Sequence, residues 1–271
     1  MKPLSVGNVV SAGLRIYRDN FKKYYRLALI ASLWSWIPIY GWAKFCAIQG
    51  LIARLAYKEI IEQPESVSDA NRYVKGRLWS YLGAAILVFL IFTAAYIGGA
   101  IIIAILAGAS AVILRSIFNT ALGDSGAVIA LIIYVILVLV SLVLFIGYLT
   151  RLYASYCVSE LSLSVEENVN ASAALKRSRE LTKGYLRNLL LVILTASLVS
   201  LPLWSLILTV QILPEFIQYN LALPSTVFTV LQLIFNSIVS ALIIPFWQAV
   251  KAVIYCDLRV RREGMGIDLR K

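Results

Sequence analysis

Basic residues recur at helical spacing near the N-terminus of this chain. Arg15, Arg18, Lys22 and Arg26 follow one another at intervals of three, four and four residues. Side chains three or four residues apart lie on one face of a helix, and Lys and Arg are attracted to the anionic headgroups of a membrane. The spacing therefore predicts a cationic helix face that binds lipid headgroups or a protein partner.

The same pattern occurs a second time further along the chain. The stretch SAGLRIYRDNFKKYYRLAL from Ser11 aligns with SAALKRSRELTKGYLRNLL from Ser172, and VKGRLWSYLG from Val74 is a weaker third copy. Each copy precedes apolar segments, as expected of an amphipathic helix that lies in the headgroup plane. Such helices could bind partners and lipids or simply anchor and orient the spans. The basic residues of the second copy are Lys176, Arg179, Lys183 and Arg187.

A third group of basic residues lies near the C-terminus, in YCDLRVRREG. On a continuous helix Asp257 reaches Arg261 and Arg259 reaches Glu263, each four residues on, and Gly264 is a suitable terminator. These pairs could simply close the last helix. Alternatively, the three arginines of this stretch could join the basic residues of the second copy in a cationic surface that binds phosphate headgroups. The basic residues concerned are Arg259, Arg261 and Arg262.

Residues for catalysis or metal binding are scarce. The chain contains no histidine, which removes the commonest general base and metal ligand. Its acids lie in loops or near the ends of apolar runs, without a carboxylate pair or a phosphate-binding glycine loop. Cys46, Cys157 and Cys256 are far apart and suggest neither a zinc site nor a disulfide framework. We expect no enzyme activity and no cofactor.

Uncharged polar residues occur inside the apolar runs. Amide side chains near kinks such as Pro202 and Pro245 could line a path through a membrane. More often, such amides form hydrogen bonds between helices. The candidates for lining a cavity are Gln211, Gln232, Asn236 and Gln248.

The composition is that of an integral membrane protein. Hydrophobic residues make up 61% of the 271 residues and charged residues only 14%, whereas soluble domains have about 25% charged residues. The net charge of +11 comes from basic clusters between apolar runs. This pattern is typical of cytoplasmic loops and argues against a nucleic-acid-binding protein.

Four apolar runs are long enough to cross a bilayer, at about residues 79–107, 127–150, 188–211 and 227–250. The run from Leu27 to Ile61 is interrupted by Pro38 and Gly41, so it is either one broken span or a hairpin. With a hairpin, 23 of the 25 basic residues lie on the same side of the membrane as the termini, and only Lys44 and Arg115 lie on the outer side. The tendency of basic residues to stay inside therefore favours a hairpin and cytoplasmic termini. Whether its arms span fully or are re-entrant stays open.

The sequence thus predicts an all-α, polytopic membrane protein with about six membrane helices. They would form three hairpins, each preceded by an amphipathic interfacial helix, in a single membrane domain over residues 1–271. Its repeat-like units would be residues 1–62, 63–162 and 163–271. Small residues four apart would allow close helix contacts, and the pairs are Ala94 and Gly98, Ala95 and Gly99, and Ala104 and Gly108.

Three stretches resemble a known family: PLSVGNVVSAGLRIYRDNF, SAALKRSRELTKG and YCDLRVRREG. They are similar to the bacterial membrane-domain family named for the membrane part of glycerophosphoryl diester phosphodiesterase. The resemblance implies six membrane helices with interfacial helices. We expect the chain to lie in the bacterial cytoplasmic membrane or an internal membrane such as the thylakoid. It implies no catalytic residues, because no soluble stretch is long enough for a phosphodiesterase barrel.

These features favour a non-enzymatic scaffold, assembly or accessory factor. It would bind anionic lipids and a membrane-associated protein partner through its cytoplasmic interfacial helices. The alternative is a transporter or lipid-handling protein with a path between the membrane hairpins.

Overall fold

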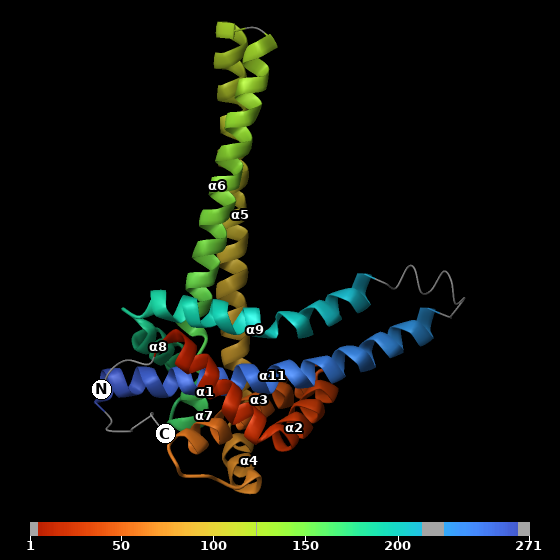
Figure 1. Ribbon diagram of the computed structural model, residues 1–271, viewed down its shortest axis with the longest axis vertical. Coiled ribbons are helices and arrows are strands. Elements are labelled where there is room, and N and C mark those ends of the chain that lie inside the picture. The colour runs from red at the N-terminus through yellow and green to blue at the C-terminus, as the bar shows by residue number, and fades with distance from the viewer. Residues whose placement is uncertain (1–4, 123, 213–224, 265–271) are drawn as a thin grey trace. The chain divides into compact units, whose positions relative to one another are not determined.

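The computed structural model describes residues 5–122, 124–212 and 225–264, and the regular structure of these residues is helical. This confirms the predicted all-α class. Figure 1 shows the helices, which are α1 (Val6–Asp19), α2 (Phe21–Trp34), α3 (Tyr40–Ile60), α4 (Val67–Lys75), α5 (Leu78–Leu122), α6 (Asp124–Tyr156), α7 (Ser159–Val165), α8 (Ala171–Thr182), α9 (Leu186–Ile212) and α11 (Ser225–Glu263).

Four of the described helical segments are long and apolar enough to cross a membrane. They are Leu78–Phe118, Gly126–Val165, Leu186–Thr209 and Thr226–Glu263, and they contain almost all of the four apolar runs predicted from the sequence. Their composition indicates a membrane protein. Helices α2 and α3 are not among them, so the count of six spans in three hairpins stays a prediction.

The first helix of each repeat-like segment begins in the same way. Ser5, Ser66 and Asn170 each accept a hydrogen bond on the side-chain oxygen from the backbone N–H three residues on, at 3.4, 3.2 and 2.9 Å. These are N-caps, which satisfy donors that the first turn of a helix leaves unpaired. The caps define the starts of α1, α4 and α8, the short helices of the three repeat-like segments.

A short non-helical turn separates the first helix of each repeat-like segment from the helix that follows. Asn20 divides α1 from α2, Gly76 and Arg77 separate α4 from α5, and residues 183–185 separate α8 from α9. Gly184 has a φ of +89°, which favours glycine. The cationic face predicted as one continuous stripe is therefore shared in each copy between two helices.

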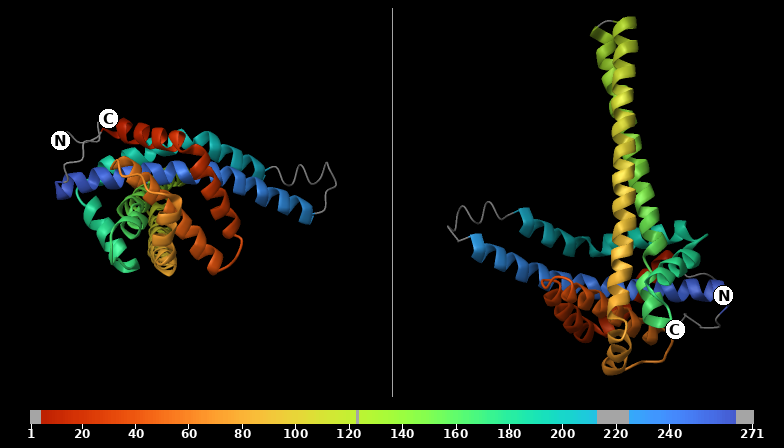
Figure 2. Two further views of the ribbon diagram at one scale, coloured as in Figure 1. Left: turned by 90° about the horizontal axis from the view of Figure 1, so that it is seen from below. Right: turned by 180° about the vertical axis from the view of Figure 1, so that it is seen from behind.

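One compact unit consists of Met1–Ile86 and Ala154–Lys271. Within it, α3 packs against α2, α4, α7 and α11, and every residue from Gly50 to Tyr57 is buried. Helix α1 lies against α9 and α11 (Figure 2). A Cβ atom at Gly13 would lie only 2.9 Å from the Cα of Val250, so this glycine permits the close approach of α1 to α11.

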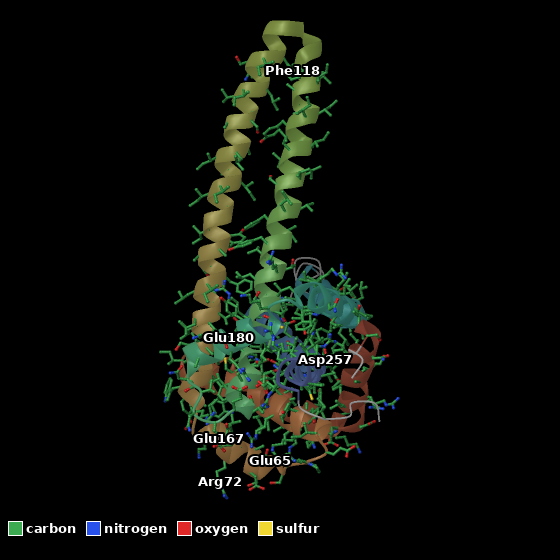
Figure 3. All side chains as sticks on the ribbon, turned by 90° about the vertical axis from the view of Figure 1, so that its left-hand side faces the viewer. Glu65, Arg72, Phe118, Glu167, Glu180 and Asp257 are labelled. Carbon is green, nitrogen blue, oxygen red and sulfur yellow. The ribbon has the colours of Figure 1, made fainter. Side chains whose placement is uncertain are left out.

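The second compact unit, Leu87–Tyr153, contains most of α5 and α6. Apolar side chains line both helices (Figure 3). A Cβ at Gly99 would lie 2.1 Å from Cε2 of Phe145, so the predicted close contact at Ala95 and Gly99 occurs at Gly99. Gly98 and Gly108, which the same pattern predicted at contacts, have open space there instead. Helix α5 also runs on to Leu122, through residues that the sequence placed after the span.

Candidate functional site

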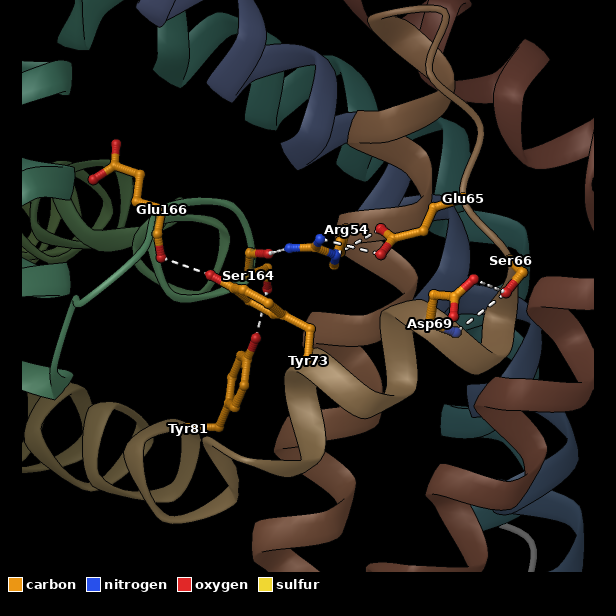
Figure 4. A network of polar contacts seen from close by, with 8 residues as sticks. All are labelled: Arg54, Glu65, Ser66, Asp69, Tyr73, Tyr81, Ser164 and Glu166. Atoms are coloured by element: carbon orange, nitrogen blue, oxygen red, sulfur yellow. Dashed lines mark hydrogen bonds and ion pairs between the residues drawn. The ribbon is translucent and has the colours of Figure 1, made fainter.

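A cluster of polar side chains surrounds the short helix α7 in the first unit. Arg54 of α3 is 9% exposed and donates to both carboxylate oxygens of Glu65, at 2.7 and 3.1 Å. Its Nη1 also donates to the backbone oxygen of Ser164, at 2.6 Å (Figure 4). A buried guanidinium is tolerated only with such partners, so Arg54 joins α3, the segment before α4, and α7.

The ring of Tyr73 on α4 makes cation–π contacts with two guanidinium groups. The Cζ atoms of Arg54 and Arg77 are 3.9 and 4.4 Å from its centroid. The Tyr73 hydroxyl and the Arg77 Nη1 both donate to the backbone oxygen of Glu166, at 2.8 and 2.7 Å. The last carbonyls of a helix have no partner within the helix, so these side chains stabilise the end of α7.

Helix α3 also approaches the start of α5 at this site. The Tyr81 hydroxyl lies 3.0 Å from Oγ of Ser164, and a Cβ at Gly50 would lie 2.3 Å from the Tyr81 ring. Only glycine leaves room here for the ring, so Gly50 permits this hydrogen bond.

A second chain of contacts leads from α7 to the end of α11. Glu166 accepts hydrogen bonds from Tyr255 at 2.7 Å and from Arg177 at 2.9 Å. Arg177 also pairs with Glu263, which accepts from Arg259 at 2.8 Å. The pKa of Arg177 is raised overall. Partial burial acts to lower it, but the hydrogen bonds and charges of Glu166 and Glu263 have the larger effect in the opposite direction. The result is a network of alternating charges that joins α8 and α11.

The predicted ion pairs at the C-terminus are present. Arg261 contacts Asp257 at 2.7 Å and Arg259 contacts Glu263 at 2.8 Å, and the helix ends before Gly264, whose φ is +65°. Arg262 donates to the backbone oxygen of Lys183. The pairs that close the helix are therefore formed, and the helix end also lies beside the second basic copy.

The basic residues of the two repeat copies have a different environment. All eight are exposed: Arg15, Arg18, Lys22, Arg26, Lys176, Arg179, Lys183 and Arg187. Arg18 lies 3.7 Å from Asp19, but both side chains are more than half exposed, and such pairs contribute little. The structure thus distinguishes the exposed basic residues of the repeat from the more buried arginines of the network.

The predicted cavity residues have varied environments. Gln248 is 1% exposed, and its amide nitrogen donates to Oε1 of Gln49 at 2.9 Å, a hydrogen bond between α11 and α3. Gln232 and Asn236 are partly buried. The side chain of Gln211 lies outside the described residues. For Gln248, the hydrogen bond between helices is therefore the role that the structure shows.

The network itself was not predicted from the sequence, and its residues are Arg54, Glu65, Tyr73, Arg77, Ser164, Glu166 and Arg177. The interruption of an apolar run by Arg54 was the one available signal, because a buried charge needs a partner. The partners are distant in sequence: Ser164 is 110 residues away. No group of His, Cys, Asp and Glu suited to a metal ion occurs among the described residues.

Comparison with known families, curated proteins and solved structures gave no significant match to this chain.

Proposed function

We propose that the chain is a non-enzymatic membrane scaffold or accessory factor. Exposed basic residues of its repeated segments would bind anionic lipid headgroups and recruit a membrane-associated protein. Its termini would be cytoplasmic, in a bacterial cytoplasmic or internal membrane, because the hairpin topology places almost all basic residues on the side of the termini. The observation that carries the proposal is the exposure of all eight basic residues of the two copies.

The ion pairs elsewhere in the same unit support this role by contrast. Arg54, Arg177 and Arg259 are committed to carboxylates, at 2.7 to 2.9 Å for their Nε atoms. The basic residues of the two repeat copies are exposed instead, so another molecule can reach their charged groups. Each basic residue near an anionic surface is worth about 1 kcal/mol.

The polar network provides a rigid support for these residues. Arg54, Arg77 and Tyr73 fix the end of α7, while Arg177 links α8 to α11. Helix α8 carries Lys176 and Arg179, whose backbone positions are thereby held. A surface held in place loses little entropy when it binds a partner.

Binding of a fluorescent phosphatidylglycerol to the purified protein in neutral detergent tests the proposal. The variant with Lys22→Gln and Arg179→Gln loses two charges from the repeat copies. We expect its Kd to rise about thirtyfold, since two cations contribute about 2 kcal/mol and each 1.4 kcal/mol is a factor of ten.

A matched control removes two exposed basic residues from outside these copies, by Arg72→Gln and Arg115→Gln. Its Kd should stay within about twofold of the wild-type value. Equal affinity of both variants and the wild type would contradict the proposal and leave the repeated helices as simple anchors.

A further inference from the structure

The connection between α2 and α3 exposes an apolar and aromatic surface. Its side chains are between 44% and 62% exposed. They lie in the sequence LWSWIPIYGW, which contains no charged residue. Clusters of exposed apolar residues of this kind mark interaction sites. The exposed residues are Leu33, Trp36, Ile37, Ile39, Tyr40 and Trp42, called here the aromatic tip.

The backbone of the aromatic tip is held in one shape. The indole nitrogen of Trp42 donates to the backbone oxygen of Ser35 at 3.1 Å. A Cβ at Gly41 would lie 2.1 Å from the backbone oxygen of Trp34, so only glycine fits there. Ile39 has a φ of +60°, which is strained for a β-branched residue. Such strain persists where the surrounding structure enforces it, and it is found at functional sites.

One basic residue, Lys44, contacts aromatic rings at the aromatic tip. The ammonium group of Lys44 is 4.7 Å from the ring centroid of Trp34 and 5.5 Å from that of Tyr40. Trp and Tyr favour the level of the lipid headgroups, and a Lys ammonium reaches toward phosphate from just below it. This combination fits a bilayer interface with anionic lipids.

The apolar part of this hairpin is too short to cross a bilayer. On α2, residues 27–32 between Arg26 and the aromatic tip rise about 9 Å. On α3, residues 45–53 between Lys44 and Arg54 rise about 14 Å. The hydrocarbon core of a bilayer is about 30 Å thick. Spanning would place a charged side chain of each helix deep in hydrocarbon, which is costly.

We propose that α2 and α3 form an insert in a single leaflet. The aromatic tip would enter the boundary between headgroups and acyl chains on the cytoplasmic side, with Lys44 and Arg26 at the level of the phosphates. Interfacial segments of this kind reach about 5–10 Å into a leaflet, which matches the apolar length of α2. The inference rests on the proposed membrane location and orientation but not on the scaffold role.

A fluorescent label at the aromatic tip tests this inference. Ile37→Cys is labelled with an NBD maleimide, with the unsubstituted chain giving the background from Cys46, Cys157 and Cys256. In vesicles of phosphatidylcholine and phosphatidylglycerol, doxyl groups at acyl carbon 5 should quench the label at least about twice as strongly as those at carbon 16. Absence of quenching, or stronger quenching from carbon 16, would overturn the inference.

Access from outside separates a single-leaflet insert from a complete span. In right-side-out membrane vesicles, external dithionite should reduce the label at Ile37→Cys at least tenfold more slowly than a label at Thr226→Cys, and as slowly as one at Lys58→Cys. Rapid reduction at Ile37→Cys would show that the hairpin spans and would overturn the inference. Protection of Thr226→Cys would instead refute the proposed orientation, while lipid quenching still decides insertion. A label at Trp36→Cys repeats both measurements at a second position of the aromatic tip.

Discussion

Arg54 contacts both carboxylate oxygens of Glu65, with Nε 2.7 Å from Oε2 and Nη2 3.1 Å from Oε1. The pair is largely buried, and the third interaction of Arg54 is with the end of α7. These three hydrogen bonds of Arg54 tie α3 to the segment before α4 and to α7.

Loss of Arg54 should destabilise the first unit strongly. Replacing one partner of a buried ion pair leaves the other charge uncompensated, which costs about 3–5 kcal/mol. We therefore expect Arg54→Ala to lower the free energy of unfolding by that amount, as measured by chemical denaturation in detergent. Arg18→Ala is the control, because the Arg18 side chain is 79% exposed and its loss should change the stability by less than about 0.5 kcal/mol. Equal stability of the two variants would refute a structural role for the pair.

Gly50→Ala should displace Tyr81. The new methyl group would lie 2.3 Å from the Tyr81 ring, and overpacking of this kind costs about 1–3 kcal/mol. Combining Gly50→Ala with Tyr81→Ala should cost less than the sum of the two single changes, because the clash then disappears. Gly76→Ala serves as control, since the nearest atom there would be 3.8 Å away. Additive costs in the double variant would mean that Gly50 and Tyr81 do not interact as described.

Gly13→Leu should loosen α1 from α11. A Cβ at Gly13 would lie 2.7 Å from Cγ2 and 2.9 Å from Cα of Val250, and a backbone atom cannot move aside easily. Hydrogen exchange of the α1 amides should become at least tenfold faster. In the same helix, Gly7→Ala meets no atom within 4 Å and should leave exchange unchanged or slower, because alanine favours helix. Unchanged exchange in Gly13→Leu would contradict the close packing of α1.

Salt should separate the two classes of basic residue. Raising the salt concentration from about 0.1 M to about 1 M shortens the screening length from about 10 to 3 Å, and buried pairs are screened much less than exposed charges. Binding of phosphatidylglycerol should therefore weaken severalfold, while the loss of stability in Arg54→Ala should change little. If lipid binding were insensitive to salt, the exposed basic residues would not be responsible for it.

Local features of the fold were predictable from the sequence because they depend on neighbouring residues. The pairs from Asp257 to Arg261 and from Arg259 to Glu263 follow from helical spacing alone. The four long apolar segments follow from hydropathy, since each exceeds the length that a bilayer requires. The exposure of the repeated basic residues also fits their spacing.

Other features depend on residues that are far apart in the chain. Nothing near Arg54 in the sequence points to Ser164 or to the role of Glu166 as a shared acceptor. The division of the first basic stretch at Asn20 was also missed, because this residue fits the helical pattern on either side. Helix α5 exceeds its predicted span because residues 109–118 are mostly apolar and contain neither Gly nor Pro to end the helix, although Arg115 lies among them.

Native purification in a mild detergent tests the central claim most directly, with protein and lipid mass spectrometry on the same eluate. We predict that the wild-type chain retains an anionic lipid or a stoichiometric protein partner. The variant with Lys22→Gln and Arg179→Gln should lose most of it, and the control with Arg72→Gln and Arg115→Gln should keep it. Identical eluates from all three proteins would contradict the claim that the repeated basic residues form the binding surface.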